Sequence, residues 1–185
     1  YCPIKRPGGS TLIPDNLEAF QPLVLAVCKD IPASRWRDSH VYLTAKTLWC
    51  TSENQGNRPG WHSDGFMTED LNYIWCNSNP TIFWKPETPT WDFEADHELS
   101  LSEMDHVCEN YGSVVTFEPY TLLKLDQYVM HRTATNITAG FRTFVKISVS
   151  YEKYTIQGSS RNHLMKEHIV YSPRSLSRNC PIGLK

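Results

Sequence analysis

Two stretches of sequence decide the fold class of this chain. The first is Val41-Tyr42-Leu43-Thr44-Ala45-Lys46-Thr47-Leu48-Trp49, and the second is Phe141-Arg142-Thr143-Phe144-Val145-Lys146-Ile147-Ser148-Val149-Ser150-Tyr151. In the second stretch Thr143, Val145, Ile147 and Val149 form a mostly apolar face, because side chains in a strand alternate between the two faces of a sheet. Arg142, Lys146 and Ser148 share the other face with Phe144. Both stretches are therefore predicted to be long β-strands.

Several shorter runs have the same character and are separated by turn signals. We expect strands over residues 71–76, 81–84, 114–117, 122–125 and 128–134. Many short strands with regular turns are typical of a sandwich or a barrel. The sequence thus predicts a mainly β fold.

The chain has the length of one domain, with 185 residues of which 40% are hydrophobic and 21% charged. This composition excludes a disordered, collagen-like or coiled-coil protein. We expect residues 1–40 to form an irregular lead-in followed by a packing helix, which begins at a capping box at Asp15 and is kinked or split by Pro22. Residues 41–151 are predicted to form the β core. A basic segment, 152–185, completes the single domain 1–185.

Within the core, residues 85–110 are strongly acidic. We interpret this stretch as an insertion or surface loop with a short helix near 100–109. The first 151 residues carry 12 basic and 18 acidic side chains, whereas residues 152–185 carry 6 basic and 2 acidic ones. A basic segment of this kind is either a solvated terminal segment or a surface that contacts the phosphates of a nucleic acid.

The cysteines and the hydropathy pattern bear on the compartment. None of the six cysteines forms a Cys-x-x-Cys motif, so zinc ribbons and thioredoxin-type redox sites have no support. We expect buried free thiols and therefore the cytoplasm or another reducing compartment, although the even number of cysteines also permits disulfides. No apolar stretch approaches the roughly 20 residues of a membrane span, so no membrane partner is expected.

The strongest candidate site combines His62-Ser63-Asp64 with the later His131. The two-residue period of an extended segment puts His62 and Asp64 on one face. With His131 they would form a set of two histidines and one carboxylate, which leaves three positions open on a six-coordinate metal, as non-haem Fe(II) oxygenases require. The ordinary alternative is a polar turn after Gly60.

Arg142 adds a possible anion contact. The segment 136–140 has the character of a turn that would fold residues 141–144 back alongside 130–133 and so place Arg142 near His131. A guanidinium beside a metal pocket can hold a carboxylate through two hydrogen bonds. An ordinary surface ion pair is the alternative role for Arg142.

The order and spacing of these residues resemble the Fe(II)/2-oxoglutarate-dependent dioxygenases, in which H-x-D/E is followed by a distal His and, about ten residues later, by Arg or Lys. The resemblance covers roughly residues 41–151. It implies a double-stranded β-helix (jelly-roll or cupin-like) with a supporting N-terminal helix. It also implies that His62, Asp64 and His131 are the catalytic residues and the ligands of Fe(II).

The resemblance further implies 2-oxoglutarate and O₂ as co-substrates, with Arg142 on the far carboxylate of 2-oxoglutarate. Tyr73 and Ser148 are the candidate helpers in binding the co-substrate. The implied activity is hydroxylation or oxidative demethylation of an organic substrate, with release of succinate and CO₂. The primary substrate stays open among a small polar molecule, a nucleotide or nucleic acid, and a protein side chain.

Substrate contacts are expected from the loop before His62, where Trp61 adjoins the histidine and Arg58 could meet an anion. Two other function classes stay open. The first is a non-catalytic jelly-roll module that binds sugar or protein. The second is a cupin-like isomerase or metal hydrolase with the same ligands, which would need no 2-oxoglutarate.

Overall fold

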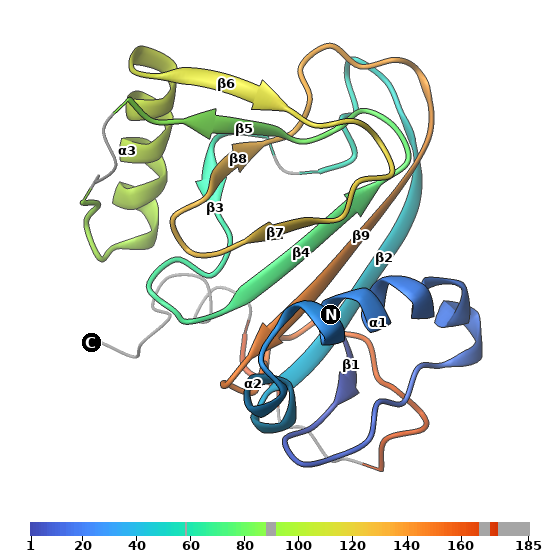
Figure 1. The fold of residues 1–185 in the computed structure, drawn as a ribbon. Helices are drawn as coiled ribbons and strands as arrows, with labels where there is room; N and C mark the ends of the chain where they lie inside the picture. Colours follow the sequence, from blue (N-terminus) through green and yellow to red (C-terminus); the bar gives the residue numbers. More distant parts are fainter. Residues whose placement is uncertain (58, 88–91, 167–170, 174–185) are drawn as a thin grey trace.

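A computed structural model describes residues 1–57, 59–87, 92–166 and 171–173 of the chain (Figure 1). Nine strands form two antiparallel sheets among these residues. The larger sheet has the order β1 (Cys2–Lys5), β2 (His40–Cys50), β9 (Gly140–Ser150), β4 (Leu71–Cys76) and β7 (Leu123–Leu125). The smaller sheet has the order β3 (His62–Ser63), β8 (Met130–Arg132), β5 (Ile82–Lys85) and β6 (Ser113–Thr116). The prediction of a mainly β fold is confirmed.

Strand pairing in the core is nested. β2 pairs with β9, β3 with β8, β4 with β7 and β5 with β6, so that the first half of the core pairs with the second half in reverse order. This arrangement brings residues that are distant in the sequence to the same point in space. It is the reason why a segment near residue 62 lies beside one near residue 131.

The turn expected at 136–140 does not make a hairpin, and that prediction is wrong. β8 pairs with β3 and β5 in the smaller sheet, whereas β9 pairs with β2 and β4 in the larger one. The connection between β8 and β9 crosses from one sheet to the other. The side chain of Asn79 fixes this crossing, because its amide donates to the Thr138 carbonyl (3.0 Å) and its carbonyl accepts from the Thr138 N–H (2.9 Å).

The N-terminal helices cover the outer face of the larger sheet (Figure 1). A 3-10 helix, η1 (Asp15–Phe20), is followed by α1 (Gln21–Asp30) and α2 (Ala33–Asp38). Pro22 lies in the first turn of α1, so the predicted split is confirmed. The predicted capping box is wrong, since Pro14 is the N-cap of η1 and no side chain caps it.

The face of β9 that was predicted to be apolar packs against α1. Val145, Ile147 and Val149 form one buried cluster with Val24 and Val27 of that helix. The opposite face of β9 is directed to the space between the two sheets, where Phe144 and Lys146 line a pocket. The predicted alternation of side chains between the two faces of β9 is therefore confirmed for both faces.

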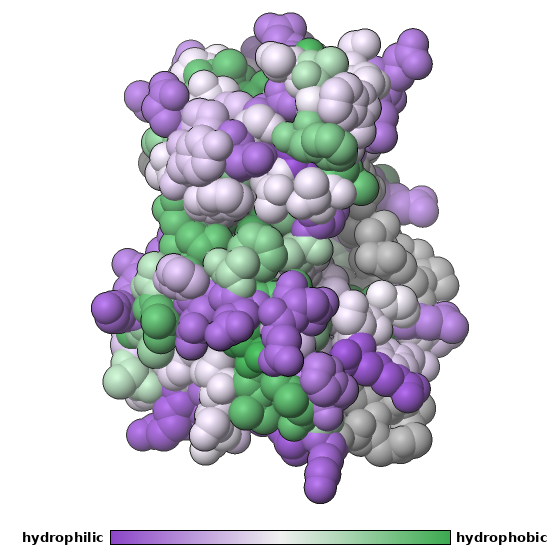
Figure 2. Space-filling model, turned by 90° about the vertical axis from the view of Figure 1, so that its right-hand side faces the viewer, coloured by the Kyte–Doolittle hydropathy of each residue, from purple (hydrophilic) through white to green (hydrophobic). Residues whose placement is uncertain are grey.

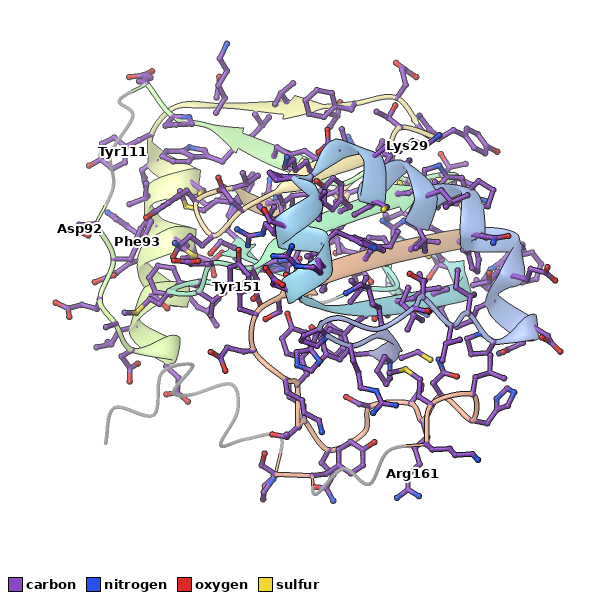
Figure 3. The ribbon with its side chains drawn as sticks, turned by 60° about the horizontal axis from the view of Figure 1, so that its bottom comes forward. Lys29, Asp92, Phe93, Tyr111, Tyr151 and Arg161 are labelled. Atoms are coloured by element: carbon purple, nitrogen blue, oxygen red, sulfur yellow. The ribbon has the colours of Figure 1, made fainter. Side chains whose placement is uncertain are left out.

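The acidic segment contributes a helix to the core. α3 (His97–Asn110) is longer than expected and begins at Asp96, whose carboxylate accepts from two backbone N–H groups of the first turn. One side of α3 packs on the end of the smaller sheet. The cluster there consists of Trp61, Trp84, Met104, Val107, Cys108 and Met130. Figure 3 shows Phe93 and Tyr111 next to this helix, and Phe93 is partly buried against the same cluster.

The described part of the basic segment packs on the rest of the domain. The Asn162 amide donates to the carbonyls of Pro3 and Leu12, at 2.8 Å each, and the Tyr154 hydroxyl donates to Asp70 at 2.5 Å. Arg161 lies on the same segment and is exposed (Figure 3). Residues 167–170 and 174–185, which carry part of the predicted basic segment, lie outside the described residues.

Cys2, Cys28, Cys50, Cys76 and Cys108 are free thiols, and all but Cys28 are buried. Cys180 lies outside the described residues. Among the residues that the structure describes, no helix has the length and hydropathy needed to cross a bilayer. Figure 2 shows hydrophobic side chains gathered across the middle of one face, between hydrophilic zones above and below. Some apolar surface is normal for a folded protein.

Candidate metal centre

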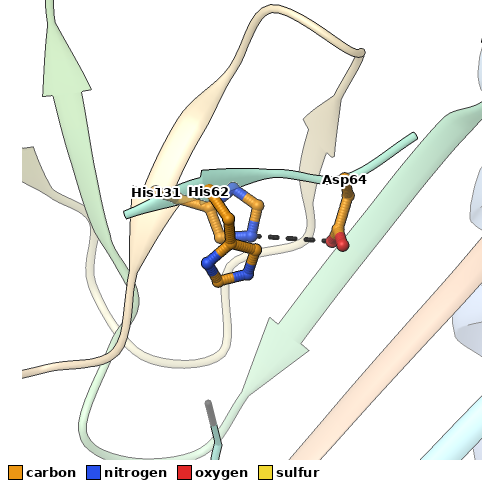
Figure 4. A group of neighbouring side chains, drawn as sticks. All are labelled: His62, Asp64 and His131. Atoms are coloured by element: carbon orange, nitrogen blue, oxygen red, sulfur yellow. Dashed lines mark ion pairs between the residues drawn. The ribbon is translucent and has the colours of Figure 1, made fainter. Parts of the chain in front are cut away.

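His62 and His131 lie directly opposite each other in the β3–β8 pair, and their ring centroids are 4.5 Å apart. Asp64 follows β3, and its Oδ2 is 3.5 Å from Nε2 of His131 (Figure 4). One ligand atom from each of the three residues lies within 4.8 Å of the others. The three side chains therefore come together as predicted, and they could hold a metal ion.

Both imidazoles are oriented by backbone carbonyls. Nδ1 of His62 is 3.1 Å from the carbonyl oxygen of Gly60, and Nδ1 of His131 is 3.0 Å from that of Val129. A carbonyl can only accept, so the proton of each neutral ring belongs on Nδ1 and the lone pair on Nε2. This is the usual arrangement for histidines that bind a metal, since the second nitrogen fixes the tautomer and the ring orientation.

The electrostatics keep the donors in the form that a metal ion needs. Burial and the neighbouring His131 lower the pKa of His62 to about 4, so its ring is neutral at pH 7. Burial by itself would raise the pKa of Asp64, but the Lys146 ammonium more than offsets this and holds the pKa well below its usual range. Asp64 is therefore a carboxylate, and a metal would not have to displace a proton from either residue.

The three residues face a pocket of about 360 Å³ between the two sheets. Lys46, Phe144 and Lys146 line it from the larger sheet, and Ser100, Leu101 and Met104 from α3. Nothing in the sequence indicated a role for Lys46, and the helix of the acidic segment was expected in an insertion or surface loop. The helical spacing of Ser100, Met104, Val107 and Cys108 was the signal that could have placed α3 against the core.

Arg142 is buried, with 3% of its surface exposed, so the alternative of an ordinary surface ion pair is wrong. Its Nε donates to the carbonyls of Ser78 and Asn79, at 3.1 Å each. Its Nη2 is buried and has no hydrogen-bond partner among the described residues. The guanidinium carbon lies 5.0 Å from the centre of the Phe144 ring, and Arg142 does not line the pocket.

Lys46 is on β2 directly opposite Phe144, and its Nζ lies 5.8 Å from the centre of the same ring. Burial lowers the pKa of Lys46, and the neighbouring charge of Arg142 lowers it further. The Lys46 ammonium donates to the Gly56 carbonyl at 2.5 Å. Among the described residues, neither Lys46 nor Arg142 takes part in an ion pair. Two cations thus lie beside the Phe144 ring, and neither has an acidic partner among the described residues.

The two candidate co-substrate helpers lie elsewhere. Tyr73 belongs to the cluster under α1, and its hydroxyl donates to Asp30 at 2.6 Å. Its neighbour Ile74 lines the pocket, so Tyr73 points to the other face of β4 and the prediction for it is wrong. Ser148 is buried and donates to the Asn72 side chain at 2.7 Å, outside the lining of the pocket.

Trp61 is a core residue, and the prediction that it contacts substrate is wrong. It is 1% exposed, and its indole N–H donates to Glu109 of α3 at 2.8 Å. Its backbone N–H donates to Asp105 of the same helix at 2.7 Å. These bonds attach the segment that carries His62 to α3. The other candidate substrate contact, Arg58, lies outside the described residues.

No protein-family model matches the sequence, and no curated protein matches it either.

Proposed function

We propose that the protein is an Fe(II)- and 2-oxoglutarate-dependent oxygenase that hydroxylates or oxidatively demethylates an organic substrate. The observation that carries this proposal is the group of His62, Asp64 and His131, in which two imidazoles and one carboxylate converge with both Nδ1 atoms facing carbonyls. Two histidines and one carboxylate are the ligands that leave a non-haem iron open to a chelating co-substrate. When bound, Fe(II) with 2-oxoglutarate and O₂ supplies the oxidising chemistry and releases succinate and CO₂.

The strand arrangement supports the proposal. The eight strands β2 to β9 pair as a nested series across two sheets, and this pairing supports a double-stranded β-helix or jelly roll. We propose this fold for the core. In it the ligands come from β3, β8 and the turn after β3, and the pocket opens between the sheets.

The cations beside Phe144 support a dicarboxylate as co-substrate. Lys46 lines the pocket, and Arg142 lies buried beside Phe144 with an Nη2 that has no hydrogen-bond partner among the described residues. A carboxylate at this end would receive a hydrogen bond from Lys46 and would offset the charge of both cations. We therefore assign the direct contact with the carboxylate to Lys46, whereas the resemblance implied Arg142 for this contact. Arg142 would contribute positive electrostatic potential from its buried position beside Phe144.

The test is anaerobic binding of 2-oxoglutarate to the Fe(II)-loaded protein. A weak visible charge-transfer band should appear in the wild type, and succinate should form when air is admitted. Lys46→Met should weaken 2-oxoglutarate binding at least about tenfold, since it removes a charged hydrogen-bond donor. Lys124→Met is the matched control, because Lys124 pairs with Asp30 on the surface of β7 and does not line the pocket.

The other outcomes identify the competing function classes. A protein that binds Fe(II) at His62, Asp64 and His131 but gives no band with 2-oxoglutarate would be assigned to the isomerase or hydrolase class. A protein that binds no divalent metal would be assigned to the non-catalytic binding modules. Either result would overturn the oxygenase proposal.

A further inference from the structure

The two carboxylate oxygens of Asp64 have different neighbours, Lys146 and His131. The Lys146 Nζ lies 2.8 Å from Oδ1 of Asp64, while Oδ2 of the same carboxylate lies 3.5 Å from Nε2 of His131. Both side chains are largely buried, with 12% and 21% of their surfaces exposed. One oxygen is therefore paired with an ammonium, and the other lies beside His131.

We infer that Lys146 is a positioning residue of the metal centre, which makes Asp64 a ligand through a single oxygen and offsets its charge. The inference rests on the metal site of the proposed function but not on its co-substrate. A neighbour that hydrogen-bonds one oxygen of a ligating carboxylate fixes the orientation of the other. Because Lys146 neutralises Asp64, a divalent ion in this site keeps a net double charge, which favours anionic molecules as its further ligands.

Lys146 also borders a second cavity. This cavity has a volume of about 150 Å³ and is lined by Tyr1, Thr44 and Ser159 as well. Thr44 is the direct partner of Lys146 across the β2–β9 pair. The hydroxyls of Thr44 and Ser159 are buried and have no hydrogen-bond partner among the described residues. The Lys146 ammonium thus pairs with the Asp64 carboxylate. The hydroxyl groups of Thr44 and Ser159, which could also accept a hydrogen bond, line the second cavity.

The decisive experiment uses Co(II) as the probe, since its visible spectrum reports the number and geometry of its ligands without any catalysis. Lys146→Met should bind Co(II) about tenfold more tightly than the wild type, because a positive charge beside the ion has gone. Its spectrum should change, since the second oxygen of Asp64 becomes free to coordinate. Lys146→Gln lacks the charge but keeps a donor for Oδ1, so it should bind more tightly while its spectrum stays close to that of the wild type.

Oxalate, added to the Co(II) proteins, tests the effect on anionic ligands. Its affinity should fall about tenfold in both Lys146→Met and Lys146→Gln, because both lack the charge that offsets Asp64. Lys46→Met is the matched control for Co(II), since it removes the same charge from the same pocket but from a lysine that is not paired with Asp64. It should leave the Co(II) spectrum unchanged and alter Co(II) affinity less than threefold.

The inference is overturned if Lys146→Met keeps the affinity and the spectrum of the wild type, or if Lys46→Met reproduces both changes. Should Lys146→Met fail to fold by circular dichroism, the comparison of Lys146→Gln with Lys146→Arg decides. Lys146→Arg keeps the charge and should retain the wild-type affinity, so equal affinities in these two variants overturn the inference. A wild type that binds no Co(II) overturns the metal site itself. If the wild type gives the charge-transfer band with Fe(II) and 2-oxoglutarate while Lys146→Met binds Co(II) as the wild type does, the proposed function is supported and only the inference about Lys146 is overturned.

Discussion

His62 and His131 are cross-strand partners, although one lies before α3 in the chain and the other after it. Their pairing joins β3, which has two residues, to β8, which has three. Strands this short are not stable by themselves. The site depends on the bonds from Trp61 to α3 and on the pairing of β8 with β5.

Metal binding should stabilise the fold through both histidines. At a Co(II) concentration one hundred times the dissociation constant, the free energy of unfolding should rise by about 2.7 kcal/mol. His131→Ala should abolish this increase, which thermal unfolding with and without Co(II) would measure. His163→Ala, at an exposed histidine, is the control and should keep the increase. An equal stabilisation in His131→Ala would place the bound metal elsewhere.

The metal-free protein should lose stability in acid because of His62. The pKa of His62 is about 4 in the folded state, against an ordinary value of 6.5. Between these pH values the imidazole is therefore protonated in the unfolded chain but not in the folded protein. The stability contribution is present above pH 6.5 and is lost as the pH falls toward 4, by about 3 kcal/mol at most. Urea unfolding of the chelator-treated protein at several pH values should show this slope. It should be reduced in His62→Asn, and an unchanged slope there would contradict the assignment.

Trp61 should matter for stability rather than for substrate. Trp61→Ala removes a fully buried ring from the cluster under α3 and should cost about 3–5 kcal/mol. Trp61→Phe keeps most of the packing, loses the bond to Glu109, and should cost much less. Urea unfolding measures both. If Trp61→Ala proved as stable as the wild type but inactive, the role in substrate binding first expected for Trp61 would be restored.

Tyr73 should be separable from the site. Tyr73→Phe removes the hydroxyl that donates to Asp30, so it should lower the midpoint of urea unfolding slightly. Since Tyr73 faces α1, the affinities for Co(II) and for 2-oxoglutarate should equal those of the wild type. A loss of 2-oxoglutarate binding in this variant, as in Lys46→Met, would mean that β4 presents its other face to the pocket.

Much of the sheet could be predicted from the sequence, because strands buried on one face carry a two-residue period. The expected run 71–76 matches β4, and the expected runs around 41–49 and 141–151 match β2 and β9 to within one residue at each end. β1 was missed, since a four-residue segment containing Pro3 carries no such period and becomes a strand only by pairing with β2. Which sheet a strand joins depends on distant partners, so local turn chemistry gave the wrong partner for β9.

Among the site residues too, those defined by the local sequence could be predicted and those defined by distant partners could not. His62, Asp64 and His131 could be found because metal ligands are defined by residue type and order. Trp61 was misassigned on adjacency alone, although neighbours in an extended segment point to opposite faces. Lys46 and Lys146 could not be recognised, because the charge that each meets is set by β2, β9 and the turn after β3 together.

The nested pairing has a consequence for the way the protein is made. The candidate ligands come from both halves of the chain, so the site cannot form until the second half has paired with the first. Folds dominated by such distant pairings close slowly. A metal ion bound between β3 and β8 would hold the two halves together and would offset part of the entropy cost of closing the chain between these strands. Metal capture would then mark the completion of folding, and a chain that had folded only in part would carry no reactive centre.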